Sequence, residues 1–112
     1  MKKTIFEGAA TALITPFDKN GKIDYKKFAE LVEFQISEGI NALVVCGTTG
    51  EASTLTDDEH RDAIAFVVKQ ANGRVPVIAG TGSNDTAYAV DLSIEAEKLG
   101  ADALLLVTPY YN

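Results

Sequence analysis

The stretch Asn41–Leu55, NALVVCGTTGEASTL, decides the fold of this chain. Its first part, Ala42–Cys46, is apolar at every position, which is typical of a strand buried on both faces of a parallel sheet. The run breaks at Gly47, and two threonines, a glycine and a glutamate follow. The break therefore marks the carboxyl end of a strand, where α/β proteins bind small polar ligands. An ordinary strand-to-helix loop built from turn residues is the alternative interpretation.

The same strand-and-helix unit recurs along the chain. Short apolar runs predict strands, and apolar residues at helical spacing predict helices. The expected strands are residues 9–14, 42–46, 75–79 and 103–107, and the expected helices are residues 25–38, 56–71 and a third ending near 99. Each unit takes about 30 residues, the size of a parallel crossover. The order predicts an α/β fold whose strands all end at one edge of a parallel sheet.

Capping residues predict where the helices begin. Asp24 is the expected N-cap of the first helix. Thr56, with Glu59 three residues on, forms a capping box that satisfies two backbone N–H groups. The third helix has three candidate caps: Ser83, Asn84 and Asp85.

Composition excludes several classes of function. The 112 residues suffice for one small domain, and the formal net charge of −6 argues against a nucleic-acid surface. No apolar run is long enough for a signal peptide or a membrane span. Cys46 is the only cysteine, which excludes an internal disulfide and favours a cytoplasmic, reducing location. His60 is the only histidine and has no cluster of ligands around it, so no metal site is expected.

Nucleotide-binding motifs do not fit this chain. Gly80-Thr81-Gly82 resembles the start of G-x-G-x-x-G, but the third glycine position is Asp85, whose charge would repel a pyrophosphate. No G-x-x-x-x-G-K-[ST] motif is present. The acids of residues 57–59 lie in the first turn of a predicted helix, where they stabilise the helix dipole and need no catalytic role.

Hydroxyl groups follow two of the predicted strands. The loop Gly47-Thr48-Thr49-Gly50 can hold a carboxylate through backbone N–H groups and threonine hydroxyls. Tyr110 and Tyr111 follow the last strand and can transfer protons or pack at an interface. The sequence therefore predicts a polar site at the carboxyl edge of the sheet.

Several segments resemble one enzyme family. Residues 47–60 read GTTGEASTLTDDEH, residues 75–84 read VPVIAGTGSN, residues 107–112 read VTPYYN, and residues 12–17 read ALITPF. Together they cover the chain and resemble the dihydrodipicolinate synthase family of pyruvate-dependent class I aldolases, to which N-acetylneuraminate lyase is related. GTTGE is shared across that superfamily, whereas GTTGE with TPYYN points to the synthases.

The resemblance implies a (β/α)8 TIM barrel that assembles as a homotetramer of two tight dimers. Such a barrel takes about 250 residues. Residues 1–112 would then form the N-terminal half of a single barrel domain, with its first four strands and three helices. We therefore expect the chain to be part of a longer protein.

The resemblance also implies a reaction. The family condenses pyruvate with aspartate semialdehyde on the way to diaminopimelate and lysine. A barrel lysine forms a Schiff base with pyruvate, and no metal or organic cofactor is implied. That lysine is expected beyond Asn112, since Lys69 and Lys98 lie in predicted helices. The 112-residue piece alone is expected to be inactive.

The resemblance implies roles for individual residues, which are matched by their position in the shared motifs. Thr48 matches the proton-relay threonine, and Thr49, with Gly47, matches the group that binds the pyruvate carboxylate. Tyr111 matches the relay tyrosine that reaches into the neighbouring subunit of the tight dimer. Tyr110 matches its partner at that interface.

A regulatory site is only partly matched. His60, Asn84 and Tyr110 match residues that bind lysine in lysine-sensitive members of the family. Asp57, however, stands where those enzymes often have histidine, and Tyr88 where they have glutamate. Losing that glutamate removes the expected partner of the lysine α-amino group, so we expect weak or absent inhibition by lysine.

Two other functions remain open from the sequence. One keeps the fold and changes the substrate, to a sugar acid or N-acetylneuraminate. The other is a non-catalytic half-barrel that associates with itself through its exposed sheet.

Overall fold

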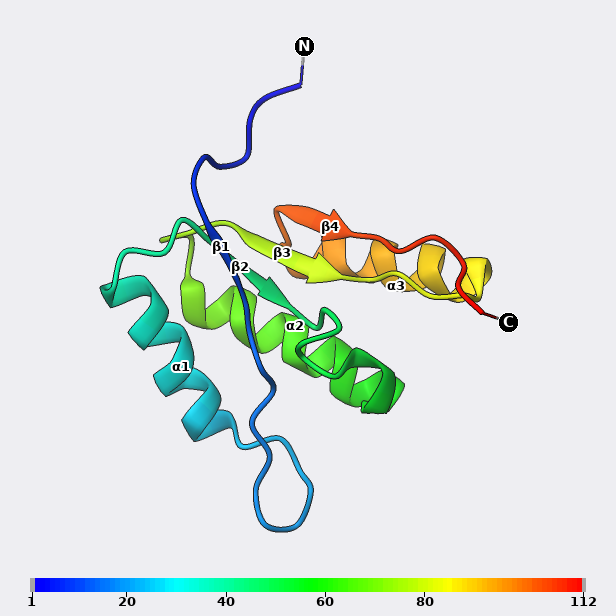
Figure 1. Cartoon of the computed structure of the whole chain (residues 1–112), viewed down its shortest axis with the longest axis horizontal. Helices are drawn as coiled ribbons and strands as arrows, with labels where there is room; N and C mark the ends of the chain where they lie inside the picture. The colour runs from blue at the N-terminus through cyan, green and yellow to red at the C-terminus, as the bar shows by residue number, and fades with distance from the viewer. Residues whose placement is uncertain (1, 112) are drawn as a thin grey trace.

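A parallel sheet flanked by helices makes up the computed structural model, which describes residues 2–111 (Figure 1). The strands are β1 (Ala10–Ala12), β2 (Ala42–Val45), β3 (Val77–Gly80) and β4 (Ala103–Leu105), and the helices are α1 (Tyr25–Ser37), α2 (Asp57–Ala71) and α3 (Thr86–Leu99). The strands lie in the order β1-β2-β3-β4, and every neighbouring pair is parallel. The predicted α/β order of strands and helices is confirmed.

The helices cover one face of the sheet. Right-handed crossovers place every helix on the same face when each new strand is added on the same side. Burial follows this arrangement, since Leu43 and Val45 are fully buried while Val44 between them is only half-buried. Just after β1, Leu13 is buried and Ile14 is 54% exposed. The prediction that residues 42–46 are buried on both faces is confirmed for Ala42, Leu43, Val45 and Cys46, each at most 2% exposed, and fails only at Val44.

The core lies between the sheet and the helices, with α2 in the middle, packed against both α1 and α3. Its largest fully buried apolar side chains are Phe28, Leu43, Ile64, Leu92, Val32, Val45, Val67 and Val77. Burying each such side chain stabilises the fold by about 1.5–3 kcal/mol. Phe66 extends the core between α1 and α2, with ring centroids 5.5 Å from Phe28 and 4.8 Å from Tyr25.

Capping follows the predictions from sequence. Asp24 accepts a hydrogen bond of 3.0 Å from the N–H three residues on. Both bonds of the capping box form, because Thr56 Oγ1 accepts from the Glu59 N–H at 3.2 Å and Glu59 Oε1 accepts from the Thr56 N–H at 2.9 Å. Among the three candidate caps of α3, Asp85 is the N-cap.

The loop after β2 differs most from the prediction. The strand ends at Val45, one residue early, because Cys46 takes a left-handed backbone conformation with φ of 57°. Glu51 has the same φ, and a short 3-10 helix, η1 (Ala52–Thr54), follows it. Non-glycine residues rarely adopt this conformation. Apolar periodicity reports which residues are buried and not their φ angles, so it did not predict the two left-handed residues.

Three strands also differ from their predicted bounds. β1 and β4 lie at the two edges of the described sheet and are shorter than predicted, because each pairs with a neighbour on one side only. β3 begins at Val77, after Pro76, since proline has no N–H to donate to a ladder. Among the described residues, no helix combines the length and apolarity needed to cross a membrane.

Candidate functional site

The loops at the carboxyl ends of β2, β3 and β4 surround a cavity of about 570 Å³, here called the carboxyl-end cavity. Its lining residues come from these three loops and from the first turns of α2 and α3: Cys46, Gly47, Thr48, Ala52, Ser53, Leu55, His60, Gly80, Gly82, Ser83, Tyr88, Leu105, Leu106, Val107 and Tyr110. No lysine or arginine is among these described residues. The cavity lies at the edge of the sheet where ligands bind in α/β folds.

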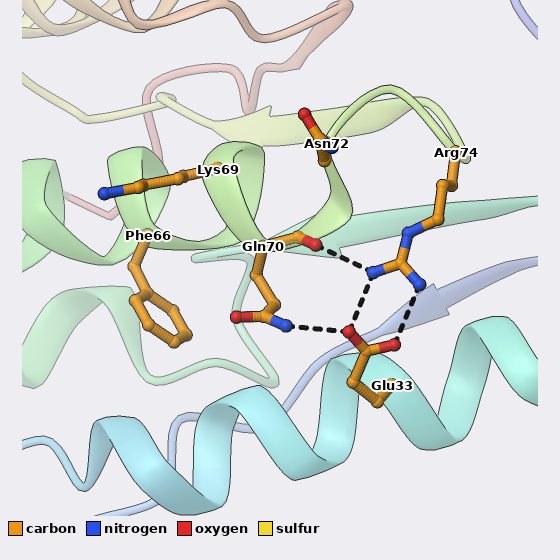
Figure 2. Close-up of a pocket in the computed structure, with 6 residues that line it drawn as sticks. All are labelled: Glu33, Phe66, Lys69, Gln70, Asn72 and Arg74. Carbon is orange, nitrogen blue, oxygen red and sulfur yellow. Dashed lines mark hydrogen bonds and ion pairs between the residues drawn. The ribbon is translucent and has the colours of Figure 1, made fainter.

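A second cavity, of about 690 Å³, lies at the opposite end of the sheet between α1 and the end of α2 (Figure 2). The polar side chains that line it hydrogen-bond to one another. Arg74 contacts both oxygens of Glu33 at 2.8 and 2.9 Å, and Gln70 donates to Glu33 at 2.8 Å. The hydrogen bond from Arg74 holds the pKa of Glu33 below its usual value. This cluster ties α1 to α2, so the carboxyl-end cavity is the candidate functional site.

The loop after β2 presents two hydroxyl groups to solvent. Thr48 and Thr49 are exposed, whereas Gly50 beside them is buried. Two backbone bonds close the loop, from the Glu51 N–H to Thr48 O at 3.0 Å and from the Ala52 N–H to Gly47 O at 3.4 Å. The threonines are therefore displayed on a tight, hydrogen-bonded turn.

Glycines let neighbouring strand ends meet backbone to backbone. A Cβ on Gly80 would collide with the carbonyl oxygen of Cys46. A Cβ on Gly50 would lie 3.1 Å from Leu13 O and 3.2 Å from Cys46 N, closer than most real contacts. The ends of β1, β2 and β3 are thus locked together around the loop.

His60 joins α2 to the end of β3. Its ring is buried, and Nε2 lies 2.7 Å from Gly80 O. A carbonyl only accepts hydrogen bonds, so the ring donates its Nε2–H. Burial lowers the pKa of His60, which favours the neutral ring at pH 7. Cys46, whose Sγ lies 3.8 Å from His60 O, is buried, and burial raises the pKa of its thiol to about 12.

A polar network links α2 to α3 beside the cavity. The Tyr88 hydroxyl donates to Asp57 at 2.7 Å, and Arg61 contacts both Asp57 oxygens at 3.0 Å and Asp91 at 2.8 Å. The hydrogen bond from Tyr88, with that from Arg61, lowers the pKa of Asp57. Burial, with the hydrogen bond to Asp57, raises the pKa of Tyr88 to about 12.

The residues predicted from sequence divide into two groups. Gly47, Thr48, His60 and Tyr110 line the carboxyl-end cavity. The others lie outside its lining and are exposed: Thr49, Asn84 and Tyr111.

Two features of the site were missed from sequence. One is the pairing of Tyr88 with Asp57. The other is a bond from the buried Thr15 hydroxyl to Gly50 O at 2.6 Å. The only signal for Thr15 was its place at the end of a predicted strand. Among residues 2–111, no group of three histidine, cysteine or acidic side chains is placed to hold a metal ion.

Similarity to known proteins extends over almost the whole chain. Residues 5–112 match the Dihydrodipicolinate synthetase family. The 4-hydroxy-tetrahydrodipicolinate synthase of Acetivibrio thermocellus is 62% identical over all of this chain, which spans 38% of that relative.

Solved structures agree with the sequence match. The dihydrodipicolinate synthase from Aquifex aeolicus superposes with a TM-score of 0.92 at 52% identity, over 96% of this chain and 36% of that one. The chloride-inhibited enzyme from Acinetobacter baumannii, complexed with pyruvate, gives 0.94 at 51% identity, over 97% and 37%. The strands and helices described above match the N-terminal part of the TIM barrel of these enzymes. The chain belongs to the dihydrodipicolinate synthetase family.

Proposed function

We propose that the protein carrying this chain condenses pyruvate with aspartate semialdehyde, in the biosynthesis of diaminopimelate and lysine. The observation that carries the proposal is the family match over residues 5–112, with 62% identity to a named synthase. The pyruvate complex of the Acinetobacter baumannii enzyme supports pyruvate as the first substrate.

In this proposal the loop after β2 handles pyruvate. Thr49 binds the pyruvate carboxylate through its hydroxyl and N–H, and Gly47 lets the ligand approach the backbone. Thr48 and Tyr111 relay protons, since a relay needs hydroxyl groups in series within hydrogen-bond reach. The support is that Gly47 and Thr48 line the cavity and that the Thr49 side chain is exposed beside it.

The Schiff-base lysine of the proposal comes from outside residues 1–112. Its amine would add to the keto carbon of pyruvate and expel water. Loss of a methyl proton would then give an enamine that attacks the aldehyde. In support, Lys69 and Lys98 are exposed on α2 and α3, and neither lines the carboxyl-end cavity. The 112-residue chain alone is proposed to be inactive, and no metal or organic cofactor is required.

The tyrosine pair suggests how subunits assemble. Tyr110 and Tyr111 are 53% and 96% exposed, and aromatic side chains of this kind are enriched at interfaces. We propose that they pack in a tight dimer, within a homo-oligomer in the cytoplasm. The single, buried Cys46 is compatible with a reducing compartment.

Borohydride trapping tests the proposal. The native full-length protein is incubated with pyruvate and borohydride and measured by intact mass spectrometry and peptide mapping. We expect a mass increase of one reduced pyruvate, on a lysine outside residues 1–112. A Thr49→Val variant should trap less pyruvate, while a Thr86→Val variant, changed at an exposed hydroxyl outside the cavity lining, should match the unmodified protein.

Two outcomes would contradict the proposal. The first is an unmodified protein, and the second is an adduct on Lys69 or Lys98. If trapping succeeds, turnover with aspartate semialdehyde, compared with cleavage of N-acetylneuraminate, decides between the synthase and the lyase reaction.

A further inference from the structure

Thr15 lies buried, 4% exposed, three residues after the end of β1 and directly before Pro16. Its Oγ1 donates its only proton to Gly50 O at 2.6 Å, across 35 residues of sequence. Nothing in the family resemblance gave this residue a part in the reaction. The bond joins the segment after the first strand to the loop that carries Thr48 and Thr49.

The bond completes an attachment of this loop at both ends. At one end, Gly80 packs on the carbonyl of Cys46 while His60 holds the carbonyl of Gly80. At the other end, Gly50 packs on the backbone of Leu13, and the Thr15 hydroxyl binds the Gly50 carbonyl. Between these two attachments the turn is closed by its own backbone bonds, from the Glu51 N–H to Thr48 O and from the Ala52 N–H to Gly47 O.

We propose that Thr15 is a positioning residue, whose hydroxyl fixes the Gly50 carbonyl and thereby the orientation of the Thr48 and Thr49 groups. This inference rests on the proposed function of the site. Without the hydroxyl, a buried carbonyl loses its donor, and the peptide group must turn toward another one. A displacement of about 1 Å in a reacting group can cost about 100-fold in rate. We therefore expect kcat/KM for pyruvate to fall by at least about tenfold.

The chain offers a matched set of variants. Thr15→Val keeps the shape and removes the donor, whereas Thr15→Ser keeps the donor. Thr11→Val is the control, because Thr11 Oγ1, in the middle of β1 and four residues before Thr15, donates to Gln35 Oε1 of α1 at 2.7 Å and not to the loop. If Thr15→Val fails to fold, Thr15→Ala serves as a second variant without a donor.

Two measurements on the native full-length protein test the proposal. The first is pyruvate kinetics, with kcat and KM measured separately. The second is amide hydrogen exchange at Glu51 and Ala52, whose N–H groups close the turn. We expect Thr15→Val to lower kcat/KM and speed this exchange, Thr15→Ser to restore both, and Thr11→Val to change neither.

Three results would overturn the positioning role. They are unchanged exchange and kinetics in Thr15→Val, failure of Thr15→Ser to restore them, and an equal loss in Thr11→Val, which would mean general destabilisation. If the unmodified protein traps no pyruvate, the proposed function fails separately. Hydrogen exchange alone then decides whether Thr15 anchors the loop.

Discussion

His60 is buried with its ring donating to Gly80 O, and burial lowers its pKa from the usual 6.5. The unfolded chain therefore binds a proton at a higher pH than the folded chain does. Below about pH 6.5, His60 takes up a proton in the unfolded state but stays neutral in the folded state. The free energy of unfolding therefore falls as the pH falls. We expect the free energy of unfolding to decrease between pH 6.5 and the lowered pKa of His60.

Urea titrations of the native protein at a series of pH values measure this effect. His60→Gln is the matched variant, because its amide can donate to the same carbonyl but does not titrate. The variant should lose less stability than the unmodified protein just below pH 6.5. Equal pH dependence of the two proteins would mean that His60 does not titrate in that range.

Gly80 allows a closer backbone approach than any other residue could. An alanine there would collide with the carbonyl of Cys46, so the two strand ends must separate. Overpacking of this kind typically costs about 1–3 kcal/mol. Gly80→Ala should therefore lower the unfolding free energy. Gly47→Ala is the control for stability, since its Cβ would meet only ordinary contacts, at 3.5 and 3.8 Å. Equal thermal stability of both variants would contradict the argument.

Individual residues were predictable from sequence where a local rule applied. Asp24 and Thr56 act on backbone groups within three residues, so their capping bonds could be anticipated. The bonds of Thr15 and His60 reach across 35 and 20 residues. No local pattern predicts such a bond, because it depends on which strand ends become neighbours.

The N-cap of helix α2, Thr56, should make a measurable contribution to the free energy of unfolding. The Thr56 hydroxyl satisfies the Glu59 N–H, which otherwise has no partner in the first turn. Thr56→Ala should lower the unfolding free energy by about 1 kcal/mol, measured by urea denaturation. The control is Thr86→Ala, at an exposed threonine in the first turn of α3, which should stay close to the unmodified protein. A loss no larger than that of the control would mean that water replaces the cap.

The order of elements was predictable, whereas their ends were not. Hydrophobic periodicity identified the strands and helices, because each buries a continuous apolar face. Their ends depend on long-range pairing instead. β4, for example, stops at Leu105, where its pairing with Gly80 of β3 ends. The left-handed Cys46 likewise has long-range neighbours, with its carbonyl against Gly80 and its Sγ 3.8 Å from His60 O.

At the scale of the whole molecule, the parallel order β1-β2-β3-β4 gathers the strand-end loops at one edge, as the sequence predicted. That topology alone places the threonine loop near Tyr110, 62 residues on from Thr48, at the carboxyl-end cavity. Sequence could not predict which side chains point into the cavity. Thr49 and Tyr111 lie outside its lining although they are neighbours of residues that line it.

The same edge allows a prediction about regulation of the native protein. Lysine-sensitive relatives are expected to have a histidine and a glutamate where this chain has Asp57 and Tyr88. Here the Tyr88 hydroxyl donates to Asp57, and Arg61 neutralises that carboxylate at 3.0 Å. Neither side chain is therefore free to bind the α-amino group of a lysine ligand. We expect weak or absent inhibition of the proposed condensation by submillimolar lysine, measured in a coupled assay.

The double variant Asp57→His with Tyr88→Glu is the matched test of that prediction. It removes the hydrogen-bonded pair of Asp57 and Tyr88 and supplies a carboxylate at position 88 for the α-ammonium group of lysine. His60 and Tyr110 still line the cavity. The variant should gain inhibition by lysine, measured relative to its own rate without lysine, because Tyr88 lines the same cavity as His60 and Tyr110. Single variants separate the two effects, since Tyr88→Phe breaks the bond to Asp57 without adding a carboxylate and should stay insensitive. Strong inhibition of the unmodified protein by submillimolar lysine would mean that the site binds lysine without a glutamate at position 88.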